Sequence, residues 1–232
     1  MSYVIPQPAR VALPVVDSDA LFPVRRIYCV GRNYAAHARE MGSDPTREPP
    51  FFFCKPTDAA VAVGPGQVLD LPYPSATSNL HHEIELVVAI GRGGADIPVE
   101  QAAAHVWGYG AGLDMTRRDL QFALRDKGRP WELGKAFDRS APITPLLPAA
   151  LAIGVDQTPV WLKVNGSLRQ SGSVADMIWS VPEIIATLST YFRLEPGDLI
   201  FTGTPEGVGA LVSGDVIEAG VDGVGSLNVR VV

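Results

Sequence analysis

The sequence predicts an α+β domain that is rich in β-structure. Many short apolar stretches of strand length are separated by Gly- and Pro-rich turns, a pattern typical of β-rich folds. Only three or four short segments have helical spacing, and they do not alternate regularly with the strands, which argues against a doubly wound sheet. The 232 residues fit one large domain or two small ones. We expect a Pro-rich, extended arm over residues 1–22 and a folded domain over residues 23–232.

The composition is that of a folded, acidic protein. Hydrophobic residues make up 47% and charged residues 19%, which excludes a disordered chain. The net charge of −6 argues against a nucleic-acid partner, but a local cluster of Arg and Lys can still bind a small anionic substrate. Cys29 and Cys54 lie in apolar stretches and form no CxxC pair, so we expect two buried free thiols in a reducing compartment. We expect a cytoplasmic protein without membrane contact, because the sequence has no signal-peptide pattern and no long apolar window.

In the first half of the chain, apolar runs predict strands and apolar residues at helical spacing predict helices. We expect strands in "RRIYCVGRNY", "FFFCK", "EIELVVAI" and "WGYGAGLDM". Helices are expected in "AAHAREMG", where Gly42 ends the helix, in "PVEQAAAHV" and in "TRRDLQFALRDKG". In the last of these, Thr116 and Asp119 have the spacing of a capping box.

The second half of the chain predicts a hairpin, a helix and several C-terminal strands. "PVWLKVNGSLRQ" has the alternation and the Asn-Gly turn of a β-hairpin. Ser180 and Glu183 are expected to cap a helix whose apolar stripe is Ile184, Leu188 and Tyr191. "FTGTPEGVG" is rich in glycine but lacks the GK[ST] ending of a P-loop, so we interpret it as a tight turn between strands.

Three carboxylates are candidates for a metal site. Glu83 and Glu85 are two residues apart in an expected strand, so both side chains lie on one face with like charges close together. That arrangement costs free energy unless a cation lies between them or water solvates the face. Asp114, at the end of the next expected strand, would add a third ligand, and an all-carboxylate set favours Mg²⁺, Mn²⁺ or Ca²⁺. The alternative is a strand edge whose acids face water.

Two further patterns are typical of catalytic residues. His37 and Glu40 are three residues apart on an expected helix and share a face, where the carboxylate would raise the basicity of the imidazole. Such a pair suits a general base, although an exposed helix face gives the same spacing. Lys135 lies in the apolar and aromatic stretch "WELGKAFD", where a desolvated ammonium could stabilise an oxyanion. The alternative is a surface Lys with a buried stem.

Taken in order, seven segments of the chain resemble the fumarylacetoacetate hydrolase family. They are "YCVGRNYAAHAREMG", "FFFCKP", "HHEIEL", "GYGAGLDMTRRDLQ", "RPWELGKAFD", "WLKVNGSLRQ" and "GDLIFTGTPEGVG". The resemblance covers residues 23–232, nearly the whole chain. The segments "RRIYCVGRNYAAHAREMG" and "REPPFFFCKP" look most like the branch of the family that cleaves 3-fumarylpyruvate in the breakdown of gentisate.

The resemblance implies a fold and a set of site residues. The fold is the family's mixed β-roll, usually built as a homodimer, with residues 23–232 as the catalytic domain. Mg²⁺ or Mn²⁺ would be held by Glu83, Glu85 and Asp114, the catalytic dyad would be His37 and Glu40, and Lys135 matches the family's lysine. The candidate substrate contacts are Arg32, Arg118, Gln121 and Thr204, with Lys55 as a further candidate. His81 matches a histidine near the first metal ligand, which implies a supporting role, and no role is assigned to His82.

The activity implied by the resemblance is metal-dependent hydrolysis of a C–C bond in a 2,4-diketo acid. The expected reaction converts 3-fumarylpyruvate to fumarate and pyruvate. Acylpyruvases and oxaloacetate decarboxylases of the same family share most of the motifs, so either activity is an alternative. A second alternative is a metal-binding domain without catalysis, against which the His37–Glu40 pair argues, because a scaffold needs no base.

Overall fold

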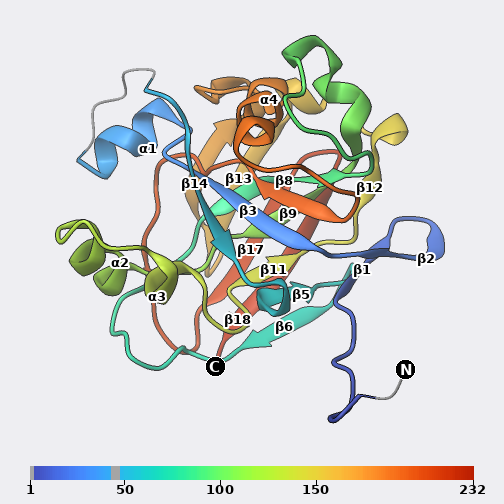
Figure 1. Cartoon of the computed structure of the whole chain (residues 1–232). Helices are drawn as coiled ribbons and strands as arrows, with labels where there is room; N and C mark the ends of the chain where they lie inside the picture. The colour runs from blue at the N-terminus through green and yellow to red at the C-terminus, as the bar shows by residue number, and fades with distance from the viewer. Residues whose placement is uncertain (1–2, 43–47) are drawn as a thin grey trace.

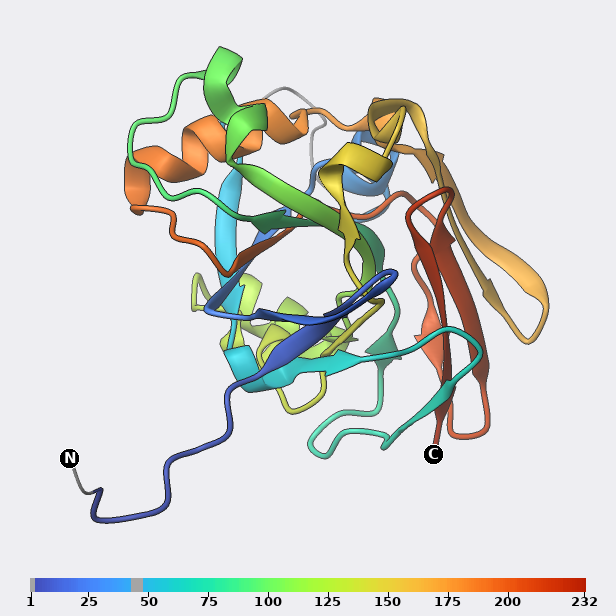
Figure 2. The same cartoon turned by 90° about the vertical axis from the view of Figure 1, so that its right-hand side faces the viewer.

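Two β-sheets packed against each other form the body of the protein (Figures 1 and 2). The structure is a computed structural model that describes residues 3–42 and 48–232. In the larger sheet two strand pairs are parallel and the others are antiparallel, so the sheet is mixed. In the smaller sheet one strand pair is parallel and the other three are antiparallel. This strand-rich architecture confirms the predicted α+β class.

The strands have the following bounds. In order across the larger sheet they are β4 (Phe51–Lys55), β3 (Arg26–Gly31), β15 (Asp198–Phe201), β8 (Ile84–Ile90), β9 (Val106–Leu113), β11 (Ala141–Ile143) and β5 (Ala60–Ala62), with β12 (Leu147–Pro148) also paired to β9. Across the smaller sheet they are β14 (Ser167–Ser173), β13 (Pro159–Val164), β17 (Val216–Val221), β18 (Gly225–Val231) and β6 (Val68–Leu71). A short third sheet joins β10 (Thr116–Arg117), β7 (Leu80–His81) and β16 (Ala210–Leu211).

Strand β8 lies at the centre of the core because its sequence has no polar face beyond its first residues. All seven of its residues, "IELVVAI", are buried, as expected for a strand covered on both sides. Its neighbour β9 carries Gly112 where a Cβ atom would lie 2.7 Å from the side chains of Phe201 and Val87. The glycine therefore lets β9 pack closely on β8, at the end where the acidic residues lie.

Helices cover the sheets and carry several of the candidate site residues. The α-helices of the described chain are α1 (Ala35–Glu40), α2 (Arg118–Arg125), α3 (Glu132–Lys135) and α4 (Val181–Tyr191). The 3₁₀-helices are η1 (Thr57–Ala59), η2 (Val99–His105), η3 (Ala149–Leu151), η4 (Val155–Gln157) and η5 (Val174–Asp176). The expected helix in "PVEQAAAHV" is thus the 3₁₀-helix η2, and α4 packs against it (Figure 2). None of the helices described is long and apolar enough to cross a membrane.

The helix caps were predicted correctly at α4 and wrongly at α2. Glu183 accepts hydrogen bonds from the backbone N–H and the hydroxyl of Ser180, at 3.0 and 2.7 Å. At α2 the Thr116 hydroxyl instead donates to the Asp114 carbonyl, because residues 116 and 117 form strand β10 and the helix begins at Arg118. The Asp119 carboxylate accepts from the Thr77 hydroxyl at 2.6 Å and so ties α2 to the preceding loop.

The apolar stripe of α4 was predicted one residue too long. Ile184 and Leu188 are buried, whereas Tyr191 is 65% exposed. Tyr191 is the last residue of the helix, and its ring lies 6.3 Å from that of Phe52 at the edge of the larger sheet. The predicted Asn-Gly hairpin is confirmed: β13 and β14 are joined by Asn165 and Gly166 with φ angles of 51° and 77°.

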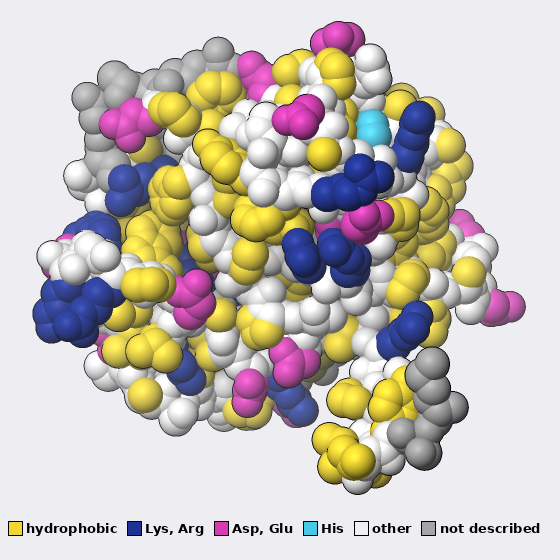
Figure 3. Space-filling view, in the orientation of Figure 1, with side chains coloured by type: hydrophobic (Ala, Val, Ile, Leu, Met, Phe, Trp, Pro, Cys, Tyr) yellow, Lys and Arg dark blue, Asp and Glu magenta, His cyan; other side chains and the backbone are white. Residues whose placement is uncertain are grey.

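The N-terminal segment is extended only in its first part. Residues 3–10 are exposed and project from the body of the molecule (Figures 2 and 3). The segment that follows forms an antiparallel hairpin of β1 (Ala12–Val15) and β2 (Ser18–Pro23). Leu13 and Phe22 from this hairpin are buried in the core of the larger sheet. The apolar alternation of "VALPVV" therefore belongs to the fold, while the division at residue 22 stays a prediction.

Candidate active site

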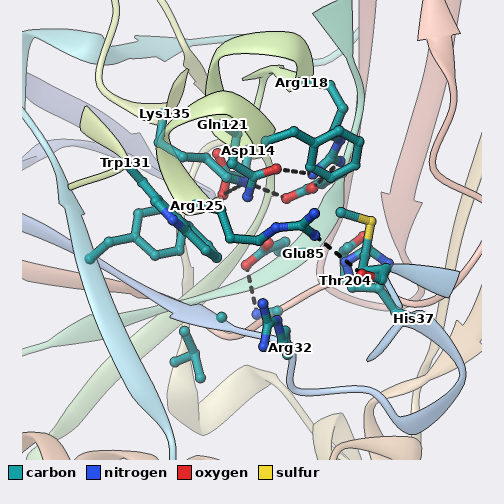
Figure 4. A pocket seen from close by; sticks show the side chains of 17 residues that line it. Arg32, His37, Glu85, Asp114, Arg118, Gln121, Arg125, Trp131, Lys135 and Thr204 are labelled. Atoms are coloured by element: carbon teal, nitrogen blue, oxygen red, sulfur yellow. Dashed lines mark hydrogen bonds and ion pairs between the residues drawn. The ribbon is translucent and has the colours of Figure 1, made fainter. Parts of the chain in front are cut away.

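The pairing of β8 with β9 brings the three predicted metal ligands together. Ile84 lies opposite Leu113 in the antiparallel ladder, and the Asp114 backbone N–H donates to the Glu83 carbonyl at 2.8 Å. Asp114 therefore lies beside Glu83, and Glu85 follows on the same face. One oxygen from each of the three carboxylates lies within 4.8 Å of the others, in the pocket shown in Figure 4.

All three acids are buried, which excludes the alternative of a strand edge that faces water. Glu83 is 4% exposed, Glu85 2% and Asp114 0%. Three hard oxygen donors that converge in a buried site are suited to Mg²⁺ or Mn²⁺. Asp114 Oδ1 fits this interpretation further, because it accepts no well-aligned hydrogen bond from a described group, although the Lys55 ammonium lies 2.7 Å away.

Three buried cations surround the acids. The Lys135 ammonium donates to Glu83 Oε2 at 2.6 Å and to Asp114 Oδ2 at 2.7 Å, and the Arg118 guanidinium donates to Glu83 Oε1. The ammonium of Lys55 lies 2.7 Å from Asp114 Oδ1 and donates to the backbone carbonyls of Met115 and Lys135. Lys135 is therefore a buried residue that contacts two of the acids, not a surface lysine. Lys55 contacts Asp114 and is not among the residues that line the pocket, and its role as a substrate contact stays a prediction.

The cations affect the pKa values of Glu83 and Glu85 in different ways. Burial alone would raise the pKa of Glu83, but Lys135 and Arg118 outweigh it and hold that pKa far below its usual range. Burial followed by the charges of Asp114 and Glu83 raises the pKa of Glu85 well above its usual value. Glu85 accepts a hydrogen bond from the Gly203 backbone N–H at 2.6 Å, but no cation among the described residues is in ion-pair contact with it. A divalent ion at the cluster would supply the positive charge that Glu85 lacks.

His37 and Glu40 pair as their spacing predicted. Both lie on α1, and His37 Nδ1 is 3.1 Å from Glu40 Oε2. The Glu40 carboxylate also accepts from the Gly207 backbone N–H at 3.1 and 3.3 Å. Burial would raise the pKa of Glu40, but the hydrogen bonds from His37 and Gly207 outweigh it and hold the pKa below its usual value. Their assignment as a catalytic dyad stays a prediction.

The Gly-rich turn "FTGTPEGVG" has a structural role that the sequence did not reveal. Its Gly203 N–H binds Glu85 of the acid cluster and its Gly207 N–H binds Glu40 beside His37. Gly203 and Gly207 have φ angles of 100° and 92°, a region that favours glycine. One turn therefore connects the acid cluster to the helix that carries His37.

The two adjacent histidines support different parts of the site. His81 accepts a hydrogen bond from Arg118 Nε at 3.3 Å, and burial with the nearby Arg118 charge lowers the pKa of His81 to about 4. A neutral His81 thus helps to orient the guanidinium that binds Glu83. His82 is 2.9 Å from Gln170 Oε1, and Gln170 Nε2 donates to the Thr204 hydroxyl at 2.8 Å. Gln170 was missed from the sequence, because its link to the site depends on strand β14.

The four predicted substrate contacts all line the pocket (Figure 4). Arg118 donates to Gln121 Oε1 at 2.6 Å, and the Thr204 hydroxyl donates to the Ile84 carbonyl at 2.7 Å. Arg32 reaches the pocket from the end of β3. The pocket also contains residues that were not predicted as site residues: Met41, Phe53, Phe122, Arg125 and Trp131. Of these, Arg125 is on the same helix as Arg118, seven residues or two turns further on, a spacing that could have indicated it.

The order and geometry of these residues agree with a comparison against protein families. The model of the fumarylacetoacetate hydrolase C-terminal family matches residues 26–232. The chain belongs to the fumarylacetoacetate hydrolase family. Family membership confirms the resemblance and the mixed β-roll fold that were predicted from the sequence motifs.

Several relatives with known names or structures are highly similar over nearly the full chain. The crystal structure of fumarylpyruvate hydrolase from Pseudomonas aeruginosa in complex with Mn²⁺ and pyruvate has a TM-score of 0.98 and 60% identity, and the match covers 100% of this chain and 99% of that one. A fumarylpyruvate hydrolase from a Ralstonia species is 47% identical, covering 81% of this chain and 95% of the relative. The mitochondrial oxaloacetate tautomerase of Rattus norvegicus is 45% identical, covering 89% and 91%.

Proposed function

We propose that the protein is a metal-dependent hydrolase that cleaves the C–C bond of a 2,4-diketo acid, with 3-fumarylpyruvate as substrate and fumarate and pyruvate as products. The observation that carries the proposal is a buried triad of carboxylates in the same pocket as His37, whose imidazole pairs with Glu40. The similarity to the Pseudomonas aeruginosa fumarylpyruvate hydrolase, whose structure contains Mn²⁺ and pyruvate, supports the choice of substrate.

Glu83, Glu85 and Asp114 would hold Mg²⁺ or Mn²⁺. When bound, the ion would act as a Lewis acid toward the carboxylate and 2-oxo oxygens of the substrate. Lys135, Arg118 and Lys55 contact Glu83 and Asp114 and orient these two carboxylates. Because both oxygens of Glu83 and one of Asp114 accept hydrogen bonds from cations, their orientation is fixed before any ligand enters.

His37 would take a proton from water. Its Nδ1 faces Glu40, which fixes the tautomer with the proton on Nδ1 and leaves Nε2 as the basic atom. The resulting hydroxide would attack the C4 carbonyl on the fumaryl side. Collapse of the oxyanion would break the C3–C4 bond and release fumarate, and the pyruvate enolate that leaves would take up a proton at C3 from the protonated His37. Glu40 is held by the Gly207 N–H, so the imidazole is oriented through two fixed contacts.

Lys135 would stabilise the oxyanion that develops at C4. An ammonium has three N–H donors, and two of them are used by Glu83 and Asp114. The third remains for the substrate oxygen. Arg118 and Gln121 would bind the substrate on the same side, because both lie on α2 at the wall of the pocket. Thr204, which lies in the Gly-rich turn after β15, would also contact the substrate.

The cellular setting follows from the family resemblance and the cysteines. We expect a homodimer in the cytoplasm that acts in the breakdown of gentisate. Both cysteines are free thiols, which suits a reducing compartment. Cys29 is buried as expected, whereas Cys54 is exposed, so the expectation that both are buried was wrong for Cys54.

A second candidate activity acts on oxaloacetate, by decarboxylation or tautomerisation. It is favoured by the 45% identity to the Rattus norvegicus oxaloacetate tautomerase. The discriminating experiment is a direct assay of 3-fumarylpyruvate, acetylpyruvate and oxaloacetate with Mg²⁺ and with Mn²⁺. We expect the highest kcat/KM with 3-fumarylpyruvate. A higher kcat/KM with oxaloacetate would make the activity on oxaloacetate the preferred function. Turnover of none of the three substrates would favour a non-catalytic metal-binding domain.

A further inference from the structure

Two arginines at the pocket are not used by the acid cluster. Arg32 extends from the end of β3 and Arg125 from the last turn of α2, and both line the cavity that holds the acids (Figure 4). The two guanidinium groups are close enough that the Arg125 charge, after burial, helps to lower the pKa of Arg32. Two like charges placed together in a half-buried cavity are unfavourable unless an anion binds them.

The protein itself supplies little negative charge to this pair. Two acids of the cluster, Glu83 and Asp114, are already in contact with buried cations, and Glu85 would be neutralised by a divalent ion. Arg125 pairs with Asp126, whose side chain is 64% exposed and lies outside the pocket. Within the described ranges no carboxylate is in ion-pair contact with Arg32, and the exposed Glu48 only partly offsets the effects of burial and Arg125 on its pKa.

Both arginines are nevertheless held in position. Arg32 has a φ angle of 59°, a left-handed conformation that costs free energy in a non-glycine residue and is often found at functional sites. Its guanidinium lies 5.6 Å from the centre of the Phe51 ring, and that ring occupies the space a Cβ atom on Gly31 would need. Arg125 lies 4.6 Å from the centre of the Phe122 ring and donates to the Met41 carbonyl at 3.4 Å.

We infer that Arg32 and Arg125 bind the carboxylate at the far end of a dicarboxylic diketo acid and thereby select such substrates over acylpyruvates. This inference rests on the proposed function. One end of the substrate, an α-oxo acid, fits the carboxylate triad with its divalent ion. The other end of 3-fumarylpyruvate is a second carboxylate, for which guanidinium groups are the best-matched partners in proteins. Acetylpyruvate has a methyl group there and would gain nothing from the arginines.

The test compares Arg32→Gln and Arg125→Gln with the wild type on two substrates. The matched control is Arg193→Gln, which removes the same charge from an exposed arginine outside the pocket. Losing one charged hydrogen-bond partner should raise the KM for 3-fumarylpyruvate by about 10- to 100-fold. The KM for acetylpyruvate should change by less than about threefold. Normal acetylpyruvate turnover would also show that the variants fold correctly.

Inhibition gives a second readout that does not depend on cleavage. Fumarate carries the far carboxylate and should inhibit the two pocket variants more weakly than the wild type, whereas oxalate should inhibit all proteins equally. An equal loss with both substrates, or no loss with 3-fumarylpyruvate, would overturn the inference while leaving the proposed function intact. If the wild type hydrolyses no diketo acid, the proposed function fails, and calorimetric binding of fumarate decides the inference alone: loss in both variants supports it, and equal binding refutes it.

Discussion

The acid cluster and His37 of the His37–Glu40 pair line the same pocket, yet the fold holds the cluster and the pair differently. The cluster lies on the central strands β8 and β9, and the side chains of Glu83 and Asp114 are 5% and 1% exposed. The pair lies on the six-residue helix α1, and the Glu40 side chain is 32% exposed. The cluster is fixed by buried ion pairs, whereas the pair depends on one turn, through Gly207. Changes in the cluster should therefore affect stability and metal binding, and changes in the pair should affect turnover.

The largest expected effect is that of removing the metal. Because the triad would hold the ion that orients the substrate, treatment with a chelator should abolish turnover, and added Mg²⁺ or Mn²⁺ should restore it. Replacing Glu83, Glu85 or Asp114 singly by Ala should lower activity at least about tenfold and weaken metal binding, as measured by calorimetry. Full activity in the chelated protein would show that the cluster is structural only.

The next effect separates the base from the binding site. His37→Ala should lower kcat by about 10²- to 10⁴-fold, the range of a positioned general base, with only a few-fold change in KM. Glu40→Gln should give a smaller loss of kcat, because it weakens the base without removing it. The melting temperature of both variants should stay close to that of the wild type, since α1 contributes few buried contacts. A rise in KM alone would make His37 a binding residue.

A third prediction compares the contributions of Glu83 and Glu85 to the stability of the metal-free protein. Glu83→Gln leaves Lys135 and Arg118 buried without their shared partner, and breaking such a pair costs about 3–5 kcal/mol of unfolding free energy. Glu85→Gln removes a buried carboxylate that no cation contacts, so the metal-free variant should be at least as stable as the wild type. Urea unfolding in the presence of a chelator measures both. Equal destabilisation by the two substitutions would contradict the unequal pairing of these acids.

The raised pKa of Glu85 predicts that the stability of the metal-free protein depends on pH. The pKa of Glu85 is raised in the folded protein, so the native state keeps this proton to a higher pH than the unfolded chain does. Stability of the metal-free wild type should therefore fall as the pH rises through the native pKa of Glu85. Glu85→Gln cannot lose a proton and should not show this contribution to the fall. Parallel pH profiles of unfolding free energy for the two proteins would refute the assignment.

The smallest effect tests how the Gly-rich turn holds Glu40. A Cβ atom on Gly207 would lie 1.9 Å from the Arg169 carbonyl oxygen, so Gly207→Ala must shift the turn and weaken the N–H contact to Glu40. The matched control is Gly214→Ala, because Gly214 has a similar φ angle of 98° with nothing within 4 Å. Both variants should lose about 1 kcal/mol or more of stability through backbone strain. Only Gly207→Ala should also lower kcat, and equal kcat values would show that the turn does not support the dyad.

The sequence by itself determined the fold class and the grouping of the acids and of the His–Glu pair. Residues two apart in a strand, or three apart on a helix, share a face whatever the rest of the chain does, so Glu83 with Glu85 and His37 with Glu40 could be predicted locally. The order of the seven motifs along the chain also indicated the family. The same local rules failed at Thr116 and Tyr191, where a short strand and a sheet edge changed the ends of two helices.

Only the tertiary structure decided which distant residues complete the site. Lys55 reaches Asp114 across 59 positions of the chain, and Gln170 reaches His82 across 88. The turn that contains Gly203 and Gly207 binds both the acid cluster and Glu40, which are far apart in sequence. Arg125 from helix α2 and Arg32 from the end of strand β3 line the same pocket. These contacts depend on strand register and on how helices pack over the sheet, which are set by burial of the whole core. No local periodicity encodes them, since a shift of one residue in one strand would turn each of its side chains to the other face.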